Sequence, residues 1–64
     1  MSYRIVRFYA NPDIPRRTIE RGLTLEEAQR HCYNLETSSA TATSKTAKAR
    51  TRRLGPWFDG YEKD

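Results

Sequence analysis

Residues 22–35, GLTLEEAQRHCYNL, are the stretch on which the predicted fold depends. Thr24 is a good helix N-cap, because its hydroxyl can accept the free N–H of the third helical residue. Glu27 stands three residues later and can accept the backbone N–H of Thr24, which completes a capping box. The apolar residues that follow recur at the spacing of one helical face: Leu25, Ala28, Cys32 and Leu35. This pattern predicts a helix over residues 25–35.

Two extended segments precede this helix. Residues 3–9, YRIVRFY, are β-branched and aromatic and place apolar groups on both alternating faces, which predicts the central strand of a small sheet. Asn11, Pro12 and Asp13 are typical turn residues. Residues 16–21, RRTIER, predict a short, charged edge strand that forms an antiparallel hairpin with the first strand.

The chain changes character after the helix. Residues 37–53 contain only Ser, Thr, Ala, Lys and Arg, so they can bury little apolar surface. We expect a long, basic, low-complexity loop here, and a short helix from a Ser44 cap to about Arg50 is the alternative. Residues 56–61 are dense in large aromatic side chains, which predicts a third strand that supplies much of the core.

Together these segments predict a single α+β domain over residues 1–64, with the element order β-β-α-β. The amphipathic helix is expected to pack on one face of a three-stranded sheet. The third strand should lie beside the first, because the helix must cross the sheet between the second and third strands.

Composition excludes several classes of protein. The chain has one cysteine and one histidine, so it can form no intramolecular disulfide and cannot close a zinc site by itself. We expect no metal and no other cofactor. No apolar run approaches the ~18 residues of a membrane span, and the arginines near the N-terminus do not suit a signal peptide. These features predict a cytoplasmic protein without a membrane partner, and self-association into a homo-oligomer remains open.

A resemblance rests on three runs: RRTIERGLTLEEAQRHC, ETSSATATS and RTRRLGPWFDGYE. In the combination GLTLEEAQ, HC, ETSS and WFDGY, the chain resembles a largely uncharacterised group of very small proteins from bacteriophages of actinobacteria, mycobacteriophages among them. The resemblance implies a location in the cytoplasm of an infected bacterial host. It also implies action by binding a host or phage component rather than by catalysis, and it assigns no site residue.

Basic residues suggest one candidate binding site. They are concentrated between residues 45 and 53, and no acidic residue lies between Thr37 and Trp57. Such a segment can neutralise phosphates of a nucleic acid, whereas a solvated linker is the alternative. Arginines of the predicted hairpin can extend the patch. The candidate nucleic-acid-binding residues are Lys45, Lys48, Arg50, Arg52, Arg53, Arg16 and Arg17.

Aromatic residues suggest a second candidate. Trp57, Phe58 and Tyr61 lie in the predicted third strand. Most aromatics in so short a chain belong to the core, but Trp57 and Phe58 are neighbours and point to opposite faces. We expect one of the two to be exposed and to act in protein binding.

Catalysis is not indicated by the remaining residues. His31 and Cys32 are neighbours on a helix and therefore diverge instead of facing each other. Asp59 and Glu62 are expected to be solvated and near a turn. We therefore interpret the chain as a non-enzyme with two hypotheses: binding of a host or phage protein (or of itself), and, alternatively, binding of nucleic acid.

Overall fold

Three antiparallel strands and two helices make up residues 2–64, the part of the chain described by the computed structural model, and they define a small α+β domain. The strands are β1 (Tyr3–Tyr9), β2 (Arg17–Leu23) and β3 (Trp57–Lys63). The helices are α1 (Leu25–Tyr33) and α2 (Lys45–Leu54), and a short 3-10 turn, η1 (Leu35–Thr37), follows α1.

The strands are ordered β2-β1-β3, so the third strand lies beside the first, as predicted. β1 pairs with β2 in the expected antiparallel hairpin. Asn11 stabilises its turn, since the side-chain oxygen accepts the backbone N–H of Asp13 at 3.0 Å. Both outer strands extend further than expected, β2 to Leu23 and β3 to Lys63.

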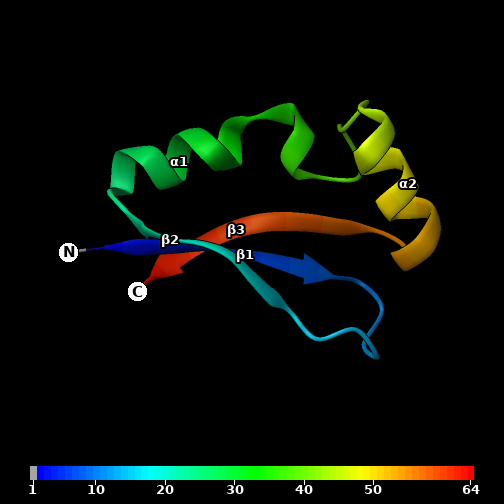
Figure 1. The fold of residues 1–64 in the computed structure, drawn as a ribbon, viewed down its shortest axis with the longest axis horizontal. Coiled ribbons are helices and arrows are strands. Elements are labelled where there is room, and N and C mark those ends of the chain that lie inside the picture. Colours follow the sequence, from blue (N-terminus) through cyan, green and yellow to red (C-terminus); the bar gives the residue numbers. More distant parts are fainter. Residues whose placement is uncertain (1) are drawn as a thin grey trace.

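The helices and η1 lie on one face of the sheet (Figure 1), which gives a flat, two-layer domain of 35 × 24 × 14 Å. Trp57 and Asp59 of β3 point toward this layer, because they contact Thr51 in α2 and His31 in α1. Side chains alternate along a strand, so Phe58 points to the other face. There it stacks on Phe8 of β1, with ring centroids 5.2 Å apart.

The capping box of α1 is confirmed. Thr24 Oγ1 accepts the N–H of Glu27 at 3.1 Å, and Glu27 Oε1 accepts the N–H of Thr24 at 2.9 Å. The expected apolar stripe is wrong at both ends, since Leu25 is 42% exposed and Leu35 is 67% exposed. The helix ends at Tyr33 instead of residue 35, because the next residue leaves the helical conformation and caps η1.

The expected loop over residues 37–53 forms only over residues 38–44, and the expectation of a single helix is wrong. The alternative helix from Ser44 is the one that forms, and it continues to Leu54. Ser44 Oγ accepts the N–H of Ala47 at 3.2 Å. Gly55 ends α2 with a φ of +81°, a conformation that favours glycine. No helix within residues 2–64 is long and apolar enough to cross a membrane.

The core is small. Its buried apolar side chains are Ile5, Val6, Ala28, Ala47 and Trp57. Trp57 is the largest of them, and it joins α2 to the sheet. The indole N–H donates to Thr51 Oγ1 at 3.0 Å, so the helix is tied to β3 by packing and by a hydrogen bond.

Candidate functional site

Helix α2 is the most basic element of the structure, and it lies at the end of the domain away from the C-terminus (Figure 1). Ala47 is buried and Leu54 is half-buried, so these positions set the side of the helix that faces the core. The basic side chains on the opposite side are exposed. We call this surface the basic face of α2, and it consists of Lys45, Lys48, Arg52 and Arg53.

Within residues 2–64, four of the eight acidic residues form ion pairs away from α2. Ion pairs join Arg4 to Glu62, Arg7 to Asp59, Arg16 to Glu62, Arg21 to Asp64 and Arg30 to Glu26. Within residues 2–64, no basic side chain of α2 takes part in an ion pair. The net charge of +4 is therefore concentrated at the α2 end of the molecule.

Glu36 fixes the start of α2, although it belongs to η1 and not to the helix. Its carboxylate accepts the backbone N–H of Thr43 at 2.9 Å and that of Ser44 at 3.0 Å. These hydrogen bonds lower the pKa of Glu36 to about 2. The carboxylate binds the residues just before the first turn of α2, where negative charge is also favoured by the helix dipole.

Arg50 differs from the other basic residues of α2. Its guanidinium carbon lies 4.7 Å from the centroid of the Trp57 ring, and Arg7 approaches the same ring at 4.8 Å. Arg50 also lines a hollow of about 320 Å³ on the surface of α2, together with Arg53, Thr46 and Ala49. We call this the arginine hollow. Arg50 is thus held by the core on one side and open to a ligand on the other.

A second depression lies beside the start of β3. It has a volume of about 250 Å³ and is lined by Tyr9, Ser38, Ser39, Pro56, Trp57 and Phe58. We call it the apolar cleft. Residues 38 and 39 run along β3, where Ser39 N–H donates to the carbonyl of Trp57 at 2.9 Å. This pairing fixes one wall of the cleft against the strand.

A buried ionic cluster connects α1 to the sheet. Arg7 Nε donates to Asp59 Oδ1 at 2.7 Å, and His31 Nε2 lies 3.1 Å from Asp59 Oδ2. The side chain of Asp59 is only 1% exposed, so the expectation of a solvated Asp59 is wrong. Burial, with a contribution from the nearby Asp59 charge, raises the pKa of the Cys32 thiol. The Asp59 carboxylate is therefore engaged by Arg7 and His31, in contacts that hold α1 against the sheet.

Asp59 is the important residue that the sequence reasoning missed. Its burial could have been expected from its position, because β3 pairs with β1 and the register places Asp59 opposite Arg7. An acidic residue in the middle of an aromatic strand is expected to find a basic partner when it is buried.

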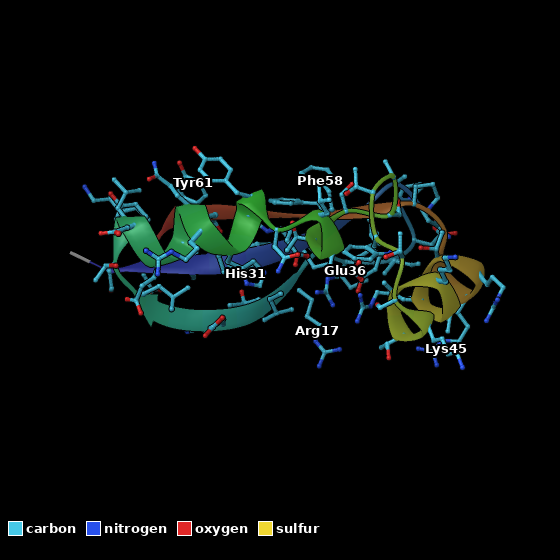
Figure 2. The ribbon with its side chains drawn as sticks, turned by 90° about the horizontal axis from the view of Figure 1, so that it is seen from above. Arg17, His31, Glu36, Lys45, Phe58 and Tyr61 are labelled. Carbon is cyan, nitrogen blue, oxygen red and sulfur yellow. The ribbon has the colours of Figure 1, made fainter. Side chains whose placement is uncertain are left out.

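The predicted nucleic-acid-binding residues come from two parts of the molecule, helix α2 and the start of β2. Four of them form the basic face of α2, and Arg50 stacks on Trp57. Arg17 begins β2, and Figure 2 shows it on the same long side of the molecule as Lys45. Arg16 is exposed, and its guanidinium lies 3.8 Å from Glu62, which partly neutralises it.

The predicted protein-binding residues differ in how much of each side chain is exposed. Trp57 is 2% exposed and therefore offers no ring to a partner, whereas Phe58 is 54% and Tyr61 41% exposed. Phe58 and Tyr61 lie on the β3 side of the molecule, across from Arg17 and Lys45 (Figure 2). The two candidate surfaces thus occupy opposite long sides.

Comparisons with protein-family models, curated proteins and solved structures found no match for this chain. Residues 2–64 contain no group of three or more side chains that could together hold a metal ion.

Proposed function

We propose that this chain acts by binding nucleic acid and that the basic face of α2 contacts the phosphate backbone. The observation that carries the proposal is the charge segregation at α2, where exposed basic side chains have no acidic partner among residues 2–64. Cations of this kind neutralise phosphates and release condensed counterions, which gives affinity for any sequence.

The folded helix strengthens this proposal relative to a mobile loop. Lys45, Lys48 and Arg52 recur at helical spacing along one side of α2, so the helix orders their backbone before any ligand binds. Binding then loses less conformational entropy than it would for an unstructured segment. Arg17 lies on the same side of the molecule (Figure 2) and can lengthen the contact.

The proposed role is binding and not catalysis. The basic face is an exposed helix surface, which attracts an anion without enclosing a reacting group.

A matched pair of double variants tests the proposal. Arg52→Gln/Arg53→Gln and Arg21→Gln/Arg30→Gln each remove two positive charges from the net +4. Affinity for a labelled oligonucleotide should fall severalfold or more in the first variant and change little in the second. Circular dichroism confirms that both are folded. Equal losses in the two variants would show that only net charge matters and would overturn the assignment to α2.

A second candidate function is protein binding through the β3 side. It is favoured by the exposure of Phe58 and Tyr61, since exposed aromatics on a strand are common anchors of interfaces. The partner would be a host or phage protein, or a second copy of the chain. Association that survives nuclease and about 0.5 M salt, and that Phe58→Ser abolishes, would favour this candidate over nucleic-acid binding.

A further inference from the structure

The arginine hollow and the apolar cleft both lie at the α2 end of the domain. Arg50 lines the hollow and Trp57 lines the cleft. The two side chains are stacked, with the guanidinium carbon 4.7 Å from the ring centroid. Pro56 also lines the cleft and follows α2 after a single glycine. A positively charged depression on α2 and an apolar depression that includes Phe58 therefore lie at the same end of the domain, and the Phe58 side chain points to the sheet face away from the helices.

The arginine hollow suits a phosphate group. Arg50 and Arg53 present guanidinium groups, whose planar arrangement of N–H donors matches phosphate oxygens. Thr46 adds a hydroxyl that can donate a further hydrogen bond. Because stacking on Trp57 restrains the Arg50 side chain, less side-chain entropy is lost when that side chain binds an anion.

The apolar cleft suits a planar ring. Its volume of about 250 Å³ lies below the range of roughly 300–1,000 Å³ that is typical of whole small-molecule sites. The Phe58 ring is stacked on Phe8 with an interplanar angle of 23°, yet Phe58 remains 54% exposed. Gly60 leaves room for this stack, since a Cβ there would lie 3.2 Å from the Phe8 ring. The exposed part of Phe58 is thus presented on a fixed support.

We propose that the apolar cleft accepts an unstacked nucleobase of a single-stranded nucleic acid whose phosphate lies in the arginine hollow. This inference rests on the proposed function, and it adds the class of nucleic acid. A flexible single strand can pass around this end of the domain from the hollow on α2 to the cleft beside Phe58 and turn a base outward. A duplex keeps its bases paired and stacked, so it can use the basic face of α2 but not the cleft.

The test compares probes of equal charge. Labelled single strands of about 12 nucleotides are prepared as oligothymidylate, as the matching oligouridylate and as an abasic strand with the same phosphates but no bases. Fluorescence anisotropy at one salt concentration gives the affinity of each. Wild type should bind a base-containing strand about tenfold more tightly than the abasic strand, as expected for one stacked base. The DNA and RNA probes show which sugar is preferred.

Two variants connect this preference to the cleft. Phe58→Leu removes the ring but keeps an apolar side chain, and it should lower affinity for base-containing strands about tenfold without changing abasic binding. Tyr61→Leu is the matched control, because Tyr61 is also exposed on β3 but does not line the cleft. It should leave both affinities unchanged. The emission of Trp57, the one tryptophan in the chain, reports whether each variant keeps its core.

Each alternative result has a definite meaning. Equal binding of base-containing and abasic strands, or no effect of Phe58→Leu, overturns the base-binding inference while leaving the basic face of α2 intact. Failure to bind these probes and also a labelled duplex of the same length overturns the proposed function itself, whereas binding of the duplex alone overturns only the base-binding inference. If Phe58→Leu instead converts an oligomer to a monomer in sedimentation velocity without altering base preference, the cleft is a protein interface and the inference fails.

Discussion

Arg50 stacks on Trp57 with its guanidinium carbon 4.7 Å from the ring centroid, and this contact joins the basic helix to the buried core. Trp57 is also hydrogen-bonded to Thr51 and is 2% exposed. The indole therefore orients α2 and its charges. Residues 37–53 have no apolar side chain larger than alanine. Helix α2 is held by Trp57, which follows it in the chain, and by Glu36, which precedes it.

Replacing Arg50 by alanine should lower the free energy of unfolding by about 1 kcal/mol, because a partly buried cation–π contact is lost. Urea unfolding followed by Trp57 fluorescence measures the change. Lys48→Ala is the control, since Lys48 is exposed on the same helix and alanine preserves helix propensity. Equal stability of the two variants would mean that the stacking contributes nothing to the fold.

Loss of Asp59 should be much more damaging. Asp59→Ala leaves Arg7, whose side chain is 15% exposed, without its carboxylate partner, and we expect a loss of about 3 kcal/mol. Glu26→Ala removes an exposed pair with Arg30 and should change stability by less than about 0.5 kcal/mol. Chemical denaturation of both variants checks the contrast. A loss for Asp59→Ala no larger than that for Glu26→Ala would contradict the buried-cluster interpretation.

The first half of the fold was largely predictable from sequence because its signals are local. The capping box at Thr24, the turn at Asn11 and the strand over residues 3–9 each depend on residues near in the chain. The position of β3 beside β1 was also predictable, because the helix must cross the sheet between the second and third strands.

The remainder depends on contacts between different elements of the fold. The sequence of α2 favours a loop, because its own side chains can bury little apolar surface. The residues that hold the helix, Glu36 and Trp57, lie outside it. The burial of Asp59 depends on Arg7 and His31, which are on two other elements. The basic candidate residues could be found from composition, but the arginine hollow and the apolar cleft require the relative placement of α2 and β3.

Glu36 should make the start of α2 sensitive to acid. Its pKa is lowered to about 2 from an ordinary value of 4.5, so its hydrogen bonds stabilise the native state above pH 4.5. That contribution is lost progressively as the pH falls from 4.5 toward 2, when the carboxylate takes up a proton. NMR titration of the Glu36 carboxyl and of the Thr43 and Ser44 amides measures this directly. A midpoint near 4.5 would contradict the hydrogen-bonded cap.

The end of α2 should depend on Gly55. Its φ of +81° lies in a region that side chains with a Cβ rarely adopt, although the space around it is open. Gly55→Ala should therefore lower the free energy of unfolding by about 1 kcal/mol through backbone strain. Thermal unfolding measures the loss, and a variant as stable as wild type would show that the helix can end in another conformation.

The central claim, that α2 binds the phosphate backbone, is tested most directly by the salt dependence of oligonucleotide binding. For a single strand contacting four to five phosphates, the logarithm of the association constant should fall with the logarithm of salt concentration with a slope of about −3. In Arg52→Gln/Arg53→Gln the slope should become shallower by about 1.5. A wild-type slope near zero, or the same slope in both proteins, would contradict the claim.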